Sequence, residues 1–114
     1  MEMNGAVAAL SALAHETRLA IYRHLVAVGH EGQRAGLIAA ALELPNGTLS
    51  FHLNQLRHAG LVTARRDGRR IVYGADYEAM GELLGYLTEN CCGGGAPCLP
   101  ASRGRADNRR ERVA

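Results

Sequence analysis

Apolar residues recur every three or four positions in four short segments of the first half of the chain. This spacing places them on one side of an α-helix and is typical of helices that pack against a core. The predicted helices span residues 4–14, 16–28, 34–42 and 47–59. In the third and fourth of these helices the side chains predicted to face inward are Leu37, Ile38, Leu42, Leu49, Leu53 and Leu56.

A tight turn separates the third and fourth predicted helices. Leu44-Pro45-Asn46-Gly47 combines residue types that interrupt helices, and Asn46 suits the N-cap of the helix that follows. Gly60 ends that helix, because glycine readily adopts the left-handed conformation found just after a helix. A helix, a tight turn and a second helix form the helix-turn-helix motif.

A β-hairpin is predicted next. The β-prone runs 61–66 and 69–74 are joined by Asp67-Gly68, a pair that favours a two-residue turn of type I′. Four arginines surround the predicted tip. They are Arg65, Arg66, Arg69 and Arg70.

A last helix is predicted over residues 76–90. Tyr77, Met80, Leu84 and Leu87 form a stripe along it at three- and four-residue steps, which is typical of a helix that packs against another helix. Asp76 can cap its N-terminus, because its carboxylate can accept a free backbone N–H of the first turn.

Length and composition indicate one globular domain. The chain has 114 residues, of which 47% are hydrophobic and 21% charged. It is too short for a typical two-domain enzyme and has no Gly-rich phosphate loop, Ser nucleophile elbow or HExxH motif, so we expect no enzyme. No apolar run approaches the ~20 residues of a membrane span, and the N-terminus lacks the features of a signal peptide. We therefore expect a cytoplasmic protein without a membrane partner.

Charge is unevenly distributed along the chain, although the net charge is only +2. Residues 57–70 hold five arginines and one aspartate, whereas residues 71–100 hold four acidic residues and no basic one. Residues 101–114 are basic again, with five arginines and two acidic residues. A compact basic block beside an acidic one indicates that one face of the protein meets a polyanion.

Two segments resemble a known family of regulators. Residues 10–21 (LSALAHETRLAI) resemble the second-helix signature of the ArsR/SmtB family of bacterial metal-responsive repressors, and residues 48–62 resemble its recognition helix. Residues 65–73 fit its wing. The resemblance implies a winged helix-turn-helix domain, mainly α with a β-hairpin wing (α+β), over residues 4–90. It also implies a homodimer through the first and last helices that binds double-stranded operator DNA and releases it when a metal or metalloid binds.

The exposed side of the fourth predicted helix and the wing carry the side chains suited to DNA. Thr and Ser can contact base edges or phosphates, Asn and Gln can read adenine, and arginines suit phosphates or the minor groove. The predicted DNA-contacting residues are Asn46, Gly47, Thr48, Ser50, Phe51, Asn54, Gln55, Arg65, Arg66, Arg69 and Arg70. Phe51 either touches a thymine methyl group or packs against the wing. We expect His52 to be a buried histidine that packs this helix rather than a ligand.

The predicted dimer interface lies on the apolar stripes of the first and last helices. Its residues are Val7, Leu10, Tyr77, Met80, Leu84 and Leu87.

Three cysteines directly follow the last predicted helix, at Cys91, Cys92 and Cys98. An odd number so close together does not form a disulfide framework and favours thiols that bind a metal or undergo chemistry. The cluster resembles the C-terminal Cys-Cys…Cys site of a subgroup of arsenic-responsive repressors. Trivalent arsenic prefers three thiolates in a pyramid, and soft ligands select soft ions. Zinc requires four ligands, and no histidine or fourth cysteine lies nearby.

The other inducer sites of the family are missing from the sequence. The predicted helix before the recognition helix has no cysteine, and the last helix has no histidine. We therefore expect a repressor that releases operator DNA when arsenic(III) binds Cys91, Cys92 and Cys98 within residues 91–98, with antimony(III) or methylarsenite as other candidate inducers. Residues 99–114 are expected to be a disordered tail. Two alternatives remain open, a redox- or cadmium/lead-responsive repressor on the same fold and a metal-binding thiol chaperone.

Overall fold

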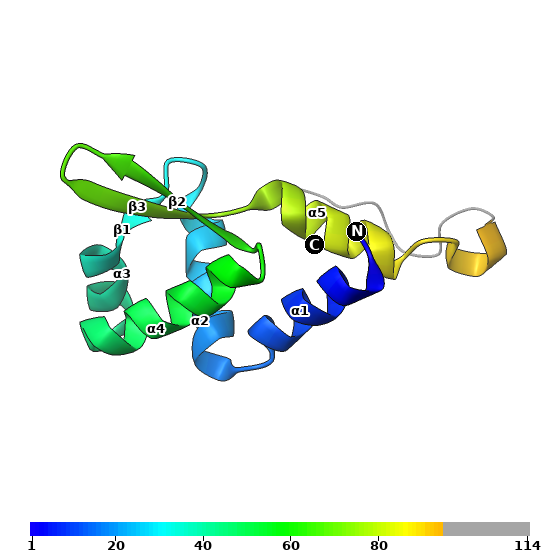
Figure 1. Cartoon of the computed structure of the whole chain (residues 1–114), viewed down its shortest axis with the longest axis horizontal. Coiled ribbons are helices and arrows are strands. Elements are labelled where there is room, and N and C mark those ends of the chain that lie inside the picture. Colours follow the sequence, from blue (N-terminus) through cyan, green and yellow to red (C-terminus); the bar gives the residue numbers. More distant parts are fainter. Residues whose placement is uncertain (95–114) are drawn as a thin grey trace, which may run out of the picture.

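The computed structural model of the chain describes residues 1–94 (Figure 1). This part contains five α-helices, three strands and one short 3-10 helix. In chain order they are α1 (Met3–Leu13), α2 (Glu16–Val28), β1 (Gln33–Arg34), α3 (Ala35–Leu42), α4 (Asn46–His58), β2 (Val62–Asp67), β3 (Arg70–Ala75), α5 (Tyr77–Leu87) and η1 (Cys91–Gly94). The expected tail at residues 99–114 lies outside the described residues. Figure 1 shows the β2–β3 hairpin at one end of the molecule, η1 at the other, and α1 and α5 between them.

The core is formed by the inner faces of α2, α3 and α4 together with the start of the hairpin. Its largest fully buried side chains are Ile21, Leu25, Ile38, Leu49, Leu53, Leu56 and Leu61. The predicted inward face of α4 is confirmed. The prediction for Leu37 is wrong, because this side chain is 45% exposed and Ala39 is buried instead. An eight-residue helix offers two neighbouring apolar faces, and packing selects the one that contains Ile38.

The sheet is antiparallel with the strand order β1-β3-β2. β2 and β3 pair from Val62 opposite Ala75 to Asp67 opposite Arg70. The hairpin is therefore confirmed, but its turn lies one residue later than predicted, at Gly68 and Arg69. Gly68 has φ +66° and Arg69 does not have a positive φ, which is the pattern of a type II′ turn rather than type I′. The short strand β1 was not predicted.

Two local motifs place α4, the second helix of the helix-turn-helix. Glu43 takes the left-handed conformation after α3, with φ 56°. α4 then begins one residue earlier than predicted, so Pro45 and not Asn46 occupies the N-cap position. At the other end Gly60 has φ +82°, and its N–H donates to the Arg57 carbonyl at 2.9 Å. The Leu61 N–H donates to the Leu56 carbonyl at 3.0 Å, which completes a Schellman motif.

The last helix is shorter than predicted and packs lightly on its own chain. The predicted cap is confirmed, because the Asp76 carboxylate accepts the Ala79 N–H at 3.0 Å. α5 ends at Leu87 instead of residue 90. The hydroxyl of the next residue, Thr88, donates to the Leu84 carbonyl, and Asn90 takes a positive φ. Among its residues only Leu83 is buried. None of the helices in residues 1–94 has the length and apolarity to cross a membrane.

Candidate nucleic-acid interface and cysteine segment

The outer side of α4 presents a row of polar side chains at its N-terminal half. Leu49, Leu53 and Leu56 anchor the opposite side in the core, which fixes the rotation of the helix about its axis. The exposed residues that result are Asn46, Gly47, Thr48, Ser50, Phe51 and Asn54. These are six of the seven residues of α4 predicted to contact DNA. The N-terminal part of a recognition helix is the part that meets base edges in the major groove.

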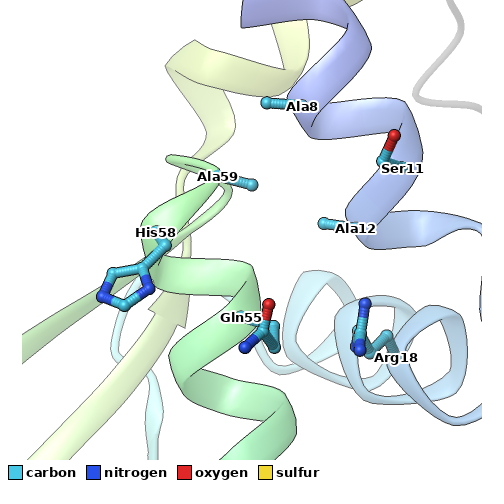
Figure 2. Close-up of a pocket in the computed structure, with 7 residues that line it drawn as sticks. All are labelled: Ala8, Ser11, Ala12, Arg18, Gln55, His58 and Ala59. Carbon is cyan, nitrogen blue, oxygen red and sulfur yellow. The ribbon is translucent and has the colours of Figure 1, made fainter.

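The seventh residue, Gln55, lies differently. It is half-buried and lines a pocket between α1, α2 and α4. Figure 2 shows its amide across the pocket from the guanidinium of Arg18 on α2. Gln55 therefore belongs to the side of α4 that faces the other helices, at the edge of the exposed face.

A cluster of rings and one cation supports the exposed face of α4 from α2. His52 is buried as predicted, with 8% of its surface exposed. The Nε–H of Arg18 donates to His52 Nδ1 at 3.2 Å, and the His15 ring lies 4.8 Å from the His52 ring. Burial lowers the pKa of His52 below its ordinary value of 6.5, and the charges of His15 and Arg18 lower it further.

Phe51 is 55% exposed beside this cluster. Its ring meets the His52 ring edge-on at 5.3 Å, and the Arg18 guanidinium carbon lies 5.9 Å from its centroid. The ring contacts that the structure shows for Phe51 therefore come from α2 and α4. This arrangement leaves much of the ring open to a partner molecule.

The wing carries its four predicted arginines on exposed positions. One of them has an additional structural contact, because Arg65 Nη2 donates to the Glu31 carbonyl at 2.6 Å. The loop that contains Glu31 passes close to β3, and a Cβ added to Gly32 would lie 2.7 Å from the Tyr73 carbonyl oxygen. The side chain of Arg65 and the close packing at Gly32 together fix the base of the wing.

The cysteine segment begins four residues after α5. The Sγ atoms of Cys91 and Cys92 are 3.5 Å apart, and both residues lie in η1. Cys92 adopts a left-handed backbone conformation, with φ 57°. Cys98 lies outside the described residues. Within residues 1–94 no group of three His, Cys, Asp or Glu side chains is arranged to hold a metal ion.

The residues predicted to form a dimer interface are mostly exposed in the single chain. Val7, Leu10, Leu84 and Leu87 are exposed, whereas Tyr77 and Met80 are half-buried. α1 instead packs on its own chain through three alanines, Ala6, Ala9 and Ala12. Tyr77 also has a role within the chain, since its hydroxyl donates to the Val26 carbonyl at 2.8 Å.

Sequence reasoning missed the supporting role of Arg18 and His15. The spacing contained a signal for Arg18, because it lies on the same helical face as Ile21, Tyr22 and Leu25. An arginine on a core-facing stripe requires a partner. No comparable signal marks His15, which caps α2 by accepting the Thr17 N–H at 3.2 Å.

Comparison with known proteins gives consistent results. Residues 13–65 match the model of a family described as a helix-turn-helix domain. Nodulation protein NolR of Rhizobium meliloti is 38% identical over 80 residues, which are 70% of this chain and 63% of NolR. The chain thus spans less than two thirds of that relative.

Several solved structures of transcriptional regulators are similar to the chain, among them the following three. An ArsR-like transcriptional regulator from a Rhodococcus species is 30% identical with a TM-score of 0.67, over 74% of this chain and 76% of that one. A homodimeric winged helix-turn-helix domain from Mycobacterium bovis, described as a possible ArsR-family regulator, is 30% identical with a TM-score of 0.61, over 77% and 82%. A possible transcriptional regulator for arsenical resistance is 32% identical with a TM-score of 0.59, over 68% and 78%.

Proposed function

The chain belongs to the ArsR family of winged helix-turn-helix transcriptional regulators, and we propose that it is a homodimeric repressor that trivalent arsenic releases from operator DNA. As a member of this family it is a transcriptional regulator rather than an enzyme. Three parts of the proposal need separate support. They are the DNA-binding surface, the inducer site and the connection between them.

The DNA-binding part rests on the exposed row of α4 and on the wing arginines. Asn, Thr and Ser side chains at the start of α4 can hydrogen-bond base edges or phosphates. The arginines of β2 and β3 add positive charge next to this helix, which favours contact with the DNA backbone. The homodimeric M. bovis domain supports a dimer for this chain, in which two copies of α4 would face two successive major grooves.

The arsenic part rests on one observation, the close approach of the Cys91 and Cys92 sulfur atoms. With sulfur–metal bonds of about 2.3 Å, two sulfurs 3.5 Å apart subtend an angle of about 100° at the bound atom. The pair could thus supply two of the three thiolates that a pyramidal ion with a lone pair prefers. Arsenic(III) and antimony(III) are ions of this kind, and both prefer thiolates. Cys98, six residues after Cys92, is proposed as the third ligand.

The connection between the two sites is proposed to run through α5. The cysteines follow the C-terminal end of this helix, and its N-terminal end contacts both α2 and the end of α4. The Tyr77 hydroxyl donates to the Val26 carbonyl of α2, and the Asp76 N–H donates to the carbonyl of Leu61 at 2.8 Å. Leu61 closes the Schellman motif of α4. A shift of α5 is therefore transmitted to the recognition helix.

The size of the effect follows from linkage between the two ligands. If arsenic binds the DNA-free conformation more tightly than the DNA-bound one, a coupling free energy of about 1–3 kcal/mol weakens DNA binding about 5- to 150-fold. Such a coupling is sufficient for induction of a repressed gene.

The test is fluorescence anisotropy of the reduced protein on DNA from its own upstream region. We expect stoichiometric arsenite, antimonite or methylarsenite to release the DNA and zinc not to release it. Cys92→Ser is expected to bind the DNA with unchanged affinity and to ignore arsenite. The matched control Glu89→Gln, an exposed position beside the segment, should respond as the unmodified protein does.

Other outcomes assign the cysteines differently. Normal release of Cys92→Ser by arsenite would refute the proposed site. Release by an oxidant, or by cadmium or lead, with no response to arsenite would make the protein a redox-responsive or a cadmium/lead-responsive repressor on the same fold. A protein with no preference for its upstream DNA would not be a repressor of that region.

A further inference from the structure

A shallow pocket of about 230 Å³ lies between α1, α2 and α4 (Figure 2). Alanines form much of its wall, and Ser11 lies on its α1 side. Figure 2 shows Arg18 and Gln55 on opposite sides of the pocket, while the His58 ring turns away from it. None of the residues that line it is acidic. The pocket is smaller than the roughly 300–1,000 Å³ of sites for drug-sized ligands, so it suits a group of a few atoms.

Arg18 gives this pocket an uncompensated positive charge. Its side chain is half-buried, and none of the residues that line the pocket with it carries a carboxylate. Of the five N–H donors of a guanidinium, only Nε has a hydrogen-bond acceptor in this part of the chain, namely His52 Nδ1. Partial removal of a cation from water is unfavourable unless an anion or hydrogen bonds compensate it. The geometry thus indicates an anion as the missing partner.

The contacts of Arg18 also hold it in place before any partner arrives. The hydrogen bond to His52 fixes Nε, and the ring of Phe51 lies on one side of the guanidinium group. A pre-positioned guanidinium binds an anion with a smaller loss of side-chain entropy. Arginine forms paired hydrogen bonds with the oxygens of a phosphate, and the Gln55 amide can supply a further donor.

We propose that this pocket is a phosphate-binding site, with Arg18 as its principal ligand and Gln55 as a second donor. Phosphate can come from two sources. One is a backbone phosphate of DNA beside the exposed face of α4, which Arg18 borders at Phe51. The other is free inorganic phosphate. The first source rests on the proposed DNA-binding function, whereas binding of free phosphate does not.

The first arm of the test measures how DNA affinity depends on salt. Each phosphate contact contributes about 0.9 to the slope of log affinity against log salt. Because the proposed dimer carries two copies of Arg18, Arg18→Gln should make this slope shallower by about 1.8 and weaken binding. Arg23→Gln is the matched control, because it removes the same charge from an exposed position of the same helix, outside the pocket. It should leave the slope unchanged.

Two further variants separate phosphate binding from support of the fold. Arg18→Lys keeps the charge but cannot form paired hydrogen bonds. Its salt slope should therefore equal that of the unmodified protein, whereas its DNA affinity should be lower. Gln55→Leu changes the pocket without removing the hydrogen bond to His52 and should also weaken binding. Far-UV circular dichroism of each variant verifies the fold.

The second arm uses no DNA. The melting temperature is measured in sodium phosphate and in sodium chloride at equal pH and ionic strength. Phosphate stabilises proteins generally, so the rise in melting temperature on changing chloride for phosphate is compared between variants. The proposal predicts a larger rise for the unmodified protein and for Arg23→Gln than for Arg18→Gln and Gln55→Leu. A change in the first arm alone assigns the site to DNA, a change in the second alone assigns it to free phosphate, and changes in both show that it takes either.

No difference in either arm would overturn the proposal. If the unmodified protein bound no DNA at all, the proposed function would fail. The second arm would still test whether the pocket binds free phosphate.

Discussion

The imidazole of His52 is buried beside the Arg18 guanidinium and the His15 ring, and its protonation state therefore affects stability. Arg18 donates to Nδ1, so this nitrogen must carry no proton in the folded protein. The pKa of His52 is lowered by burial, by His15 and by Arg18. The unfolded chain then binds a proton at a higher pH than the folded chain does.

We predict that this residue makes the protein less stable in mild acid. Its contribution to the free energy of unfolding is complete above pH 6.5, the ordinary value, and is lost as pH falls through the lower pKa of the folded state. Urea unfolding between pH 5 and 8 measures the effect. His52→Gln should reduce the decline in acid, and His58→Gln, an exposed position on the same helix, is the matched control. An equal decline in His52→Gln would assign the acid sensitivity to other groups.

Spacing predicted the burial of His52 but not its partners. The imidazole lies on the same side of α4 as Leu49 and Leu56, so the helical period alone placed it inside. The contact with Arg18 joins residues 34 positions apart, and no local pattern encodes such a pair. Cys91 and Cys92 are neighbours in the sequence, so their closeness in space was predictable. The approach of Cys98 to them stays a prediction.

At the scale of elements, the turn between α3 and α4 contains a local conflict. Glu43 adopts the left-handed conformation there, with φ 56° and ψ 48°. A side chain with a Cβ makes this conformation unfavourable by roughly 1–2 kcal/mol, and glycine avoids that cost. The surrounding hydrogen bonds hold the residue in place, including the one from the Leu44 N–H to the Ala39 carbonyl at 2.9 Å.

We predict that Glu43→Gly stabilises the protein by about 1 kcal/mol. Glycine adopts the left-handed backbone without strain, which stabilises the folded state. The greater freedom of glycine in the unfolded chain offsets part of this stabilisation. Chemical denaturation measures it. Glu43→Ala removes the carboxylate but keeps the Cβ, so it should show little of the gain. Equal stability of the two variants would attribute any effect to the charge.

Elements with a clear period or turn signal were predictable from the sequence, and short ones were not. The five helices and the hairpin follow from apolar spacing and from glycine at Gly60 and Gly68. The turn position was off by one, because Asp67-Gly68 and Gly68-Arg69 both fit two-residue turns and strand pairing decides between them. The strand β1 has only two residues, which is too few for any alternation to be visible.

At the scale of the whole molecule, exposed apolar side chains of α1 and α5 fit the dimer that we propose. Leu84 and Leu87 are 55% and 54% exposed on α5, and Val7 and Leu10 are exposed on α1. The ends of these two helices are close, since the Tyr86 hydroxyl approaches Met3 Sδ at 3.7 Å. An exposed apolar patch built from two adjacent helices is typical of an interface between proteins.

We predict that Leu84→Glu converts the dimer to a monomer with an intact fold. A charge on this stripe would be buried without a partner in the dimer but solvated in the single chain. Light scattering at micromolar concentration should show half the mass, with an unchanged far-UV spectrum. The matched control Glu82→Gln alters an exposed position off the stripe and should remain dimeric. A dimeric Leu84→Glu would place the interface elsewhere.

The sparse packing of α5 on its own chain has a consequence for gene dosage. Leu83 is the one buried residue of this helix, and in the proposed dimer the second copy would cover its exposed side chains Leu84 and Leu87. When the protomer concentration lies below the dissociation constant of the dimer, the amount of dimer varies with the square of the protomer concentration. If the proposed dimer is the form that binds DNA, halving the amount of the protein would reduce the bound fraction of a sparsely occupied DNA site about fourfold. If the chain is the repressor that we propose, a cell that dilutes it by growth would begin to express the controlled gene even without an inducer.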